Sequence, residues 1–375
     1  MKELEYPFDA AYIIKKRKSL KKALLADGTS RIRKKIAVLG GSTTSDIVKT
    51  LELFLLDAGI EPEFYESEYA QYFQDAMFPD ETLLSFKPDI VFIHTTNRNV
   101  TDWPEMIDTT EQIDEKLHTE INRFTAMWKS IAEKFHCPII QNNFEMPLYR
   151  LLGSRDAWDI HGRTNFLTRL NEAFYAYARE NESFYIHDLN FVSADYGLKE
   201  WSNPLFWNMY KYAMCFEAIP SFAFSVSHII KSIFGKNKKA LALDLDNTLW
   251  GGVVGDDGVD GIEIGQETGV SQSYYEFQTY VKQLKSLGIV LTVCSKNDHE
   301  NAIAGLNHPE GALRPDDFVI IKANWENKDR NIAETAAELN ILPDSIVFAD
   351  DNPAEREIVR TQIKGAAVPD MDGVE

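Results

Sequence analysis

Two aspartates stand two positions apart near the end of an apolar segment. The segment covers residues 241–249, and the two acids are Asp244 and Asp246. Alternate residues of a strand point the same way, so both carboxylates can face a site where the strand runs out. One carboxylate can attack phosphorus while the other transfers the proton to or from the reacting oxygen. The pair therefore suggests phosphoryl chemistry.

Glycines follow this pair at once. Gly251 and Gly252 come directly after Trp250, and glycine lets the backbone turn closely around an anion. Main-chain amides in such a turn can hold phosphate oxygens. The segment after the two acids is therefore a candidate phosphate-binding turn.

Three further apolar segments are each followed by polar residues. They are 289–294 before Ser295, 318–321 before Lys328, and 345–349 before Asp350 and Asp351. Open parallel sheets bind ligands beyond the carboxyl edges of their strands. We therefore expect these polar groups to converge with the first two acids at one edge of a sheet.

The order of these motifs resembles the four-motif signature of the haloacid dehalogenase superfamily. The signature here is Asp-Leu-Asp-Asn-Thr-Leu, then a serine, then a lysine, then Asp-Asp. The longer string 243–258 is similar, in particular, to the FkbH-like branch. The resemblance covers the chain from about Arg33 onward.

The resemblance implies a role for each residue. Asp244 is then the nucleophile that forms an aspartyl-phosphate, and Asp246 protonates the leaving oxygen and afterwards activates water. Ser295, Asn247 and Lys328 bind the transferring oxygens and offset their charge. Asp350 then lies behind these groups and positions the lysine.

The resemblance also implies a magnesium ion. A carboxylate that meets an anionic phosphate needs its repulsion cancelled, and a hard divalent cation with oxygen ligands does this best. The expected ligands are Asp244, the main-chain carbonyl of Asp246, and Asp351.

Two assignments stay open. Asp350 and Asp351 are adjacent in the sequence, so either could touch the ion. Lys322 competes with Lys328 for the lysine role, although the spacing Trp325-x-x-Lys328 fits the branch pattern better.

Neither connection between the motifs has room for a cap domain. Residues 249–293 hold a glycine-rich flap, one helical segment near 271–287 and a strand, and residues 296–327 hold one helix and one strand. Many relatives close a cap over small substrates. An uncapped site suggests a bulky substrate, or a lid that another domain supplies.

Strands and helices also alternate upstream of the first motif. Strands are expected at 35–39, 63–65, 89–94, 138–141 and 185–188, and a helix at 44–58 after the turn Gly40-Gly41-Ser42. Such alternation is typical of a doubly wound parallel sheet. We therefore predict two Rossmann-like α/β domains, the second a capless haloacid dehalogenase-like fold.

The polar segment 235–239, after an amphipathic helix near 223–234, is the expected boundary. The predicted organisation is a basic amino-terminal arm at 1–32, an α/β domain at 33–235, and the phosphatase-type domain at 236–375. The chain stops soon after a strand-like segment at 365–369, so the hypothesis that it is a fragment of a longer protein stays open.

The amino-terminal domain resembles the SGNH-hydrolase-like domain of FkbH-like proteins. Ser42 stands where that fold places its nucleophile, and Asn97 or Asn99 where it places an oxyanion-hole side chain. The Asp-x-x-His motif of such esterases is absent from the sequence. Histidines elsewhere could act as the base, but we favour structural, hydrogen-bonded roles for them; the candidates are His94, His161, His187 and His228.

The formal net charge of −19 argues against nucleic-acid binding, because a phosphate backbone would be repelled over most of the surface. Basic residues are nevertheless bunched in the first 35 positions. They form either a solvated helix face or a docking surface for an acidic protein partner.

No segment resembles a signal peptide or a membrane span, so a cytoplasmic location is expected, without membrane partners. The cysteines Cys137, Cys215 and Cys294 are not spaced as a metal site, and buried thiols are the favoured interpretation.

Two functions from different classes follow. The first is a magnesium-dependent phosphatase or phosphotransferase with a phosphorylated substrate; the FkbH-like resemblance extends this to glyceryl transfer from an acyl phosphate to an acyl carrier protein. Cys215 is the one thiol that could lie near an interface for such a transfer. The alternative is a non-catalytic, partner-binding scaffold that retains a metal site. The presence of Asp246 favours the enzyme, since a metal-holding relic would not need it.

Overall fold

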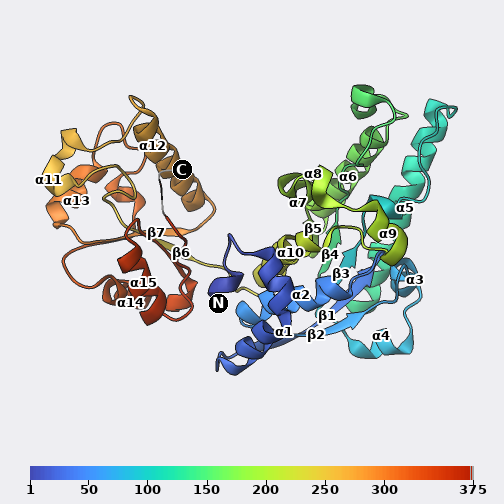
Figure 1. Ribbon diagram of the computed structural model, residues 1–375, viewed down its shortest axis with the longest axis horizontal. Coiled ribbons are helices and arrows are strands. Elements are labelled where there is room, and N and C mark those ends of the chain that lie inside the picture. Colours follow the sequence, from blue (N-terminus) through green and yellow to red (C-terminus); the bar gives the residue numbers. More distant parts are fainter. Residues whose placement is uncertain (372, 374–375) are drawn as a thin grey trace. The chain divides into compact units, whose positions relative to one another are not determined.

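The computed structural model describes residues 1–371 and 373. Contacts divide the chain into two compact units, Met1–Gly235 and Lys236–Glu375. The division falls at the polar segment 235–239. Each unit has its own parallel sheet with helices around it, so the prediction of an α/β fold is confirmed (Figure 1).

The sheet of the first unit has the strand order β2-β1-β3-β4-β5, and every neighbouring pair is parallel. The strands are β1 Ile32–Gly40, β2 Ile60–Glu66, β3 Ile90–His94, β4 Ile139–Asn142 and β5 Phe184–His187. All five residues of β3 are buried, as expected for a strand with helices on both sides.

Helices cover both faces of this sheet. One buried cluster joins Ile36 and Val38 of β1 to α1, α2 and α10, and the other joins Ala37 and Leu39 to α3, α5 and α6. The helices of the unit are α1 Ala10–Ala26, α2 Ser45–Asp57, α3 Tyr72–Met77, α4 Glu81–Phe86, α5 Thr110–Phe135, α6 Arg163–Glu180, α7 Leu189–Tyr196, α8 Leu198–Trp201, α9 Pro204–Tyr210 and α10 Ile219–Ile233.

Trp128 of α5 is the largest side chain in the second of these clusters. It is fully buried, and its ring lies 4.7 Å from Phe174 and 4.6 Å from Phe184 between centroids. Its indole N–H donates to Gln141 of β4. Each aromatic pair contributes about 0.5–1.5 kcal/mol beyond its area burial, so this cluster fastens α5 and α6 to the sheet.

Residues of the basic amino-terminal segment form α1, which packs on the first unit. Asp9 caps the helix by accepting from the amide of Tyr12, and Ile13, Leu20 and Leu24 are buried at helical spacing. Ion pairs from α1 to α2 join Arg17 to Asp46 and Lys21 to Glu52.

The sheet of the second unit has the order β8-β7-β6-β9 and is also parallel throughout. Its strands are β6 Ala240–Leu243, β7 Val290–Ser295, β8 Ile320–Ala323 and β9 Ile346–Ala349, and its helices are α11 Val254–Asp257, α12 Gly269–Ser286, α13 His299–Leu306, α14 Lys328–Glu338 and α15 Pro353–Gln362. Leu241 and Leu243 pack into one cluster and Ala240 and Ala242 into another. The sheet therefore has hydrophobic packing on both faces.

Three predicted strands of the second unit differ most from the structure. β6 ends at Leu243, so the two predicted catalytic acids lie in the loop beyond it. β8 begins at Ile320, because 315–317 forms a 3-10 turn and pairing with β7 starts only there. The strand-like segment 365–369 forms only an isolated bridge, from Ala367 to Val347.

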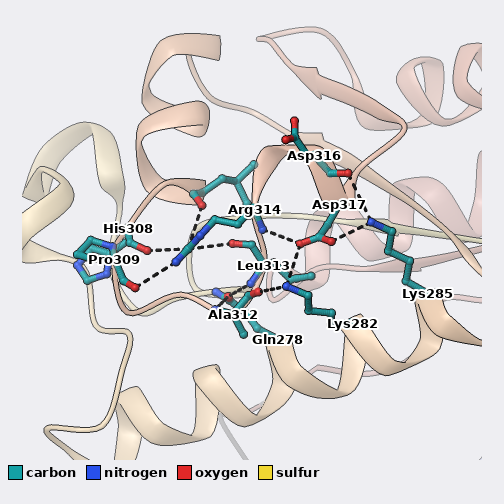
Figure 2. Close-up of polar contacts among 11 residues, drawn as sticks. Gln278, Lys282, Lys285, His308, Pro309, Ala312, Leu313, Arg314, Asp316 and Asp317 are labelled. Carbon is teal, nitrogen blue, oxygen red and sulfur yellow. Dashed lines mark hydrogen bonds and ion pairs between the residues drawn. The ribbon is translucent and has the colours of Figure 1, made fainter.

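The connection from β7 to β8 holds α13 and a loop that is fastened to α12 (Figure 2). Gln278 of α12 accepts from the amides of Ala312 and Leu313, and Lys285 pairs with Asp317. Arg314 donates to main-chain carbonyls within the loop, those of Leu306, His308, Pro309 and Leu313. This connection is therefore a braced loop without an inserted cap.

Seven short 3-10 segments complete the described elements: Lys2–Leu4, Asn97–Asn99, Gly153–Ala157, Phe216–Ala218, Val259–Gly261, Pro315–Asp317 and Pro343–Ser345. Within the described residues, no helix combines the length and hydrophobicity that a membrane span requires.

Candidate active site in the second unit

The strand order of the second unit changes direction between β6 and β9. Ligands of open α/β sheets bind beyond the carboxyl ends of the strands at such a point. A cavity of about 200 Å³ lies at this edge, lined by Asp244, Asp246, Asn247, Ser295, Lys296, Lys328, Asp351, Asn352 and Glu355. Every predicted site residue except Asp350 lines this cavity, and Asp350 lies next to the lining, in contact with Lys328.

Lys328 is the centre of the charge network. It is the first residue of α14 and only 3% exposed. Its Nζ lies 2.8 Å from Oδ2 of Asp244 and 2.5 Å from Oδ2 of Asp350. Burial alone would lower the pKa of Lys328, but the two carboxylates raise it above the ordinary value. The lysine is therefore a buried, charged ammonium.

Asp350 has both carboxylate oxygens engaged. Oδ2 accepts from Lys328, and Oδ1 accepts from the amide of Asn352 at 2.8 Å. Burial and the nearby charge of Asp244 raise the pKa of Asp350, while Lys328 counteracts them. Asp350 is thus well placed to hold the lysine.

Carboxylate oxygens of Asp244, Asp350 and Asp351 all lie within 4.8 Å of one another. Among the described residues, Oδ1 of Asp244 is a buried oxygen without a hydrogen-bond partner, although buried polar atoms normally have one. An unpartnered oxygen among carboxylates fits a hard divalent cation. Asp351 lines the cavity, whereas Asp350 lies outside the lining and already accepts from Lys328 and from the amide of Asn352, so Asp351 is the better placed of the two adjacent acids to hold a cation beside Asp244.

The side chain of Asp246 is held apart from this three-acid cluster. Oδ1 accepts from the indole N–H of Trp250 at 2.9 Å and from the amide of Val254 at 3.0 Å, and Oδ2 accepts from Nδ2 of Asn297 at 2.9 Å. Burial is the main cause that raises the pKa of Asp246, and the charge of Asp244 adds to it. A carboxyl with a raised pKa suits proton transfer.

Ser295 and Asn247 line the same cavity from different segments. Ser295 is the last residue of β7 and is 2% exposed. Asn247 has a φ of +54°, a left-handed conformation that asparagine tolerates better than most residues. Its Oδ1 accepts from the amide of Gly252, and so it fixes the start of the glycine-rich flap.

Lys322 does not reach this cavity. Its Nζ pairs with Glu338 at 2.5 Å and Glu334 at 3.4 Å, both on α14. The later start of β8 places Lys322 on the strand itself. Of the two lysines that the sequence left open, the structure brings Lys328 to Asp244.

Several lining residues were not predicted. Lys296 and Glu355 form an ion pair of 2.6 Å at the cavity, and Asn352 caps α15. A signal for Lys296 was available, since it directly follows Ser295. The contacts of Trp250 and Asn297 with Asp246 depend on how the flap and the loop after β7 fold, which no local sequence pattern predicts.

The candidate residues of the first unit are arranged differently. Oγ of Ser42 is buried and has no hydrogen-bond partner among the described residues. Nδ2 of Asn99 donates to the carbonyl of Gly41, and Nδ2 of Asn97 donates to the carbonyl of Glu145. Both asparagines are therefore tied to the main chain.

The four candidate histidines have other surroundings. His94 and His187 bind Asn142, His161 binds Asp159, and the ring of His228 packs on Phe224. Within the described residues, no hydrogen bond joins a histidine to Ser42. The predicted nucleophile Ser42 thus has no hydrogen-bonded histidine within the described residues.

A family comparison gives the relationship of the chain. The family described as "FkbH, N-terminal domain" matches residues 35–231, which is more than half of the chain. The chain belongs to this family. No protein with a curated description matches this FkbH-family protein.

A solved structure resembles the FkbH-family protein over almost its whole length. It is the N-terminal part of the protein BF1531 from Bacteroides fragilis, which contains a phosphatase domain complexed with Mg. The two chains are 31% identical with a TM-score of 0.85, and the match covers 95% of this chain and 93% of that one. The likeness therefore includes both units.

Two weaker likenesses cover 58% and 59% of the FkbH-family protein. A putative acylhydrolase, BF3764 from Bacteroides fragilis, is 16% identical with a TM-score of 0.33 over 97% of its chain. A GDSL-like lipase, BT0569 from Bacteroides thetaiotaomicron, is 13% identical with a TM-score of 0.32 over 99% of its chain. Similarity at this level carries no argument, so the predicted SGNH-like character of the first unit gains no support from it.

Proposed function

We propose that this protein is a magnesium-dependent phosphatase or phosphotransferase of the haloacid dehalogenase type, with Asp244 as its nucleophile. One observation carries the proposal: Asp244 is oriented by Lys328 through Oδ2, while its Oδ1 is buried without a partner beside two further carboxylates. The magnesium-bound phosphatase domain of the similar BF1531 structure supports it.

The first chemical step forms a covalent intermediate. A carboxylate oxygen of Asp244 attacks phosphorus in line, and the bond from phosphorus to the leaving oxygen breaks. Asp246 gives a proton to that oxygen as it leaves. Lys328 and Ser295 hold the phosphoryl oxygens whose charge shifts during the transfer.

The second step releases the phosphoryl group. Asp246, now ionised, takes a proton from water, and the water oxygen attacks phosphorus of the aspartyl-phosphate. The bond to Asp244 breaks, and inorganic phosphate leaves. In a phosphotransferase, an acceptor hydroxyl replaces the water.

Mg²⁺ fits this site because an anionic substrate must approach several acids. Asp244, Asp351 and the main-chain carbonyl of Asp246 would hold it, and the bound ion would neutralise phosphate charge. Lys328 contributes one further positive charge to the same region.

A carrier protein is the partner that the basic face of α1 suits. Lys15, Lys16, Lys18 and Lys22 are exposed there, on a chain whose net charge is −19. Leu25, 52% exposed, contributes an apolar edge to a shallow hollow beside Lys18 and Lys22. An acidic acyl carrier protein would meet complementary charge at this face and repulsion over most of the remaining surface.

The cysteines bear on how a glyceryl transfer would proceed. Cys294 is buried, and Cys137 and Cys215 are only partly exposed. Burial raises the pKa of Cys137 and of Cys294 to about 12, which disfavours their thiolates. Cys137 and Cys294 are therefore poorly suited to accept the glyceryl unit, and the acceptor that we propose is the thiol of the carrier protein itself.

Release of phosphate from 4-nitrophenyl phosphate by the full chain tests the enzyme. We expect activity that requires Mg²⁺ and loss of it in Asp244→Asn. In Asp246→Asn we expect kcat to fall by about 10²- to 10⁴-fold, the usual contribution of a general base, because hydrolysis of the aspartyl-phosphate needs Asp246 to take a proton from water. Lys322→Gln is the matched control and should retain activity. Activity that neither aspartate variant changes would reject the assignment of these residues, and absence of Mg²⁺-dependent activity in the wild-type chain would favour the partner-binding scaffold.

Carrier docking has its own test. Titration of the chain with a purified acidic acyl carrier protein should show salt-sensitive binding. Replacement of Lys15, Lys16, Lys18 and Lys22 by glutamate should remove it, while glutamate at Lys282 and Lys285, on α12, should not. Binding that survives the α1 replacements would show that α1 is not the docking surface.

A further inference from the structure

Two segments of the chain donate hydrogen bonds to the carboxyl group of Asp246. The flap supplies the indole N–H of Trp250 and the amide of Val254, both to Oδ1, and the loop after β7 supplies Nδ2 of Asn297 to Oδ2. A carboxylate oxygen accepts about two hydrogen bonds. Oδ1 is therefore filled by these two donors, while Oδ2 keeps one free position. Oδ2 is the atom from which a proton can be exchanged.

Trp250 is itself fixed by a close packing contact. The side chain is 1% exposed, and its six-membered ring lies against Gly305 of α13. A Cβ at position 305 would lie 2.8 Å from both Cη2 and Cζ2 of the indole. These atoms belong to a rigid, enclosed ring, so an added methyl group would displace the whole side chain.

We infer that Trp250 and Asn297, and Gly305 acting through Trp250, are positioning residues for proton transfer by Asp246. The inference rests on the proposed function. Trp250 joins α13 to the acid: its ring packs on the helix while its N–H reaches Oδ1. A displacement of about 1 Å in a catalytic group can cost about 100-fold in rate. Gly305 lies outside the cavity lining and touches no reacting atom.

Substrates with different leaving groups distinguish an effect on proton transfer from other effects on the enzyme. When the bond from phosphorus to the leaving oxygen breaks, the electron pair stays on that oxygen. An alkoxide needs the proton of Asp246, whereas 4-nitrophenolate is stable without one. Misplacing Asp246 should therefore slow an alkyl phosphate strongly and an activated aryl phosphate weakly, a difference that general damage to the fold would not produce.

The experiment compares kcat/KM for ethyl phosphate and 4-nitrophenyl phosphate at saturating Mg²⁺, because kcat/KM reports formation of the aspartyl-phosphate. Trp250→Phe, Asn297→Ala and Gly305→Ala should lose about 10- to 100-fold in kcat/KM with ethyl phosphate and less than about threefold with the aryl ester. Asp246→Asn should show the same difference between the two substrates, with a larger loss on ethyl phosphate. Trp325→Phe is the matched control, since that exposed indole donates to Asp298. Gly269→Ala, with open space at its Cβ, is the second control. Both should behave as wild type.

The indole N–H resonance of Trp250 gives a readout without catalysis. It is assigned by its disappearance in Trp250→Phe, and it should move in Asp246→Asn and Gly305→Ala but not in Trp325→Phe. An unmoved resonance in Gly305→Ala would overturn the role of the glycine, even if the wild-type chain released no phosphate. Equal losses on both substrates, or none, in Trp250→Phe and Asn297→Ala would overturn the positioning role. Wild-type inactivity on both esters would count against the proposed function instead.

Discussion

His94 and His187 are joined through the side chain of Asn142. The three are the last residues of β3, β5 and β4, respectively. Nδ2 of Asn142 donates to Nδ1 of His94, and Oδ1 accepts from Nδ1 of His187, each at 2.8 Å. The amide orientation thus assigns the proton of His94 to Nε2 and that of His187 to Nδ1. Nε2 of His187 then accepts from Oγ of Ser225.

This arrangement predicts loss of stability in acid. Burial lowers the pKa of both histidines to about 3, from an ordinary value of 6.5. The unfolded chain therefore binds more protons between these values, and the free energy of unfolding falls as the pH drops from 6.5 towards 3. Each histidine contributes up to about 1.4 kcal/mol per pH unit. Urea denaturation at pH 7, 6 and 5 measures the slope.

His187→Gln should reduce that slope relative to wild type, because glutamine does not titrate. His118→Gln, at an exposed position of α5, is the control and should leave it unchanged. A slope that His187→Gln leaves intact would mean that this histidine is already protonated in the folded protein.

The buried carboxyl group of Glu145 should make stability change with pH in the opposite direction. Burial raises its pKa from 4.5 to about 8, although the amide of Asn97 donates to it. The folded protein keeps this proton while the unfolded chain loses it, so the contribution to stability is complete below pH 4.5 and declines as the pH rises to 8. Glu145→Gln, which stays neutral, should gain thermal stability relative to wild type from pH 5 to pH 9.

The comparison with wild type is made at each pH, because the histidine and glutamate effects oppose each other between pH 4.5 and 6.5. Glu133→Gln, at an exposed site on α5, should show a constant difference. A constant difference for Glu145→Gln as well would indicate that Glu145 is ionised in the folded state.

Replacing Lys328 by methionine should harm both stability and catalysis. Asp244 and Asp350 would be left in a buried site without their cation, at a cost of about 3–5 kcal/mol. Loss of charge stabilisation should lower kcat by about 10²- to 10³-fold. Urea denaturation and phosphate release measure the two effects. Lys322→Met, whose acidic partners are 44% and 50% exposed in their side chains, should cost less than about 1 kcal/mol.

Asp351 and Asp350 should differ in their response to magnesium. Asp351→Asn is expected to raise the Mg²⁺ concentration for half-maximal activity by about 10- to 100-fold, since it weakens a proposed ligand. Asp350→Asn should lower kcat through Lys328 with a smaller change in that concentration. Activity measured against Mg²⁺ concentration distinguishes them, and the reverse pattern would assign the ligand to Asp350.

The α/β fold and most of the residues that line the cavity could be predicted from the sequence. Parallel strands that are buried on both faces appear in the sequence as apolar segments. The strands before Ser295 and Asp350 could therefore be predicted. A parallel sheet then brings the strand ends to one edge. Asp244, Asp246, Asn247, Ser295, Lys328 and Asp351 accordingly line one cavity, while their catalytic roles remain predictions.

Other features depended on contacts between distant segments. Lys322 and Lys328 were both plausible until the register of β8 placed the first beside Glu338. Gly305 looks like an ordinary glycine in a helix, and only the packing of Trp250 shows why a side chain would not fit there. The amide of Asn142 joins two histidines from separate strands. No local spacing of residues in the sequence predicts this contact.

The ammonium of Lys328 has a consequence for removal and re-addition of the metal ion. It is a counter-charge that the polypeptide carries permanently, set between two acids that would otherwise repel each other. Protein stripped with a chelator should for this reason keep its shape and regain its ion on simple addition, so that loading and unloading would be a reversible cycle rather than a refolding event.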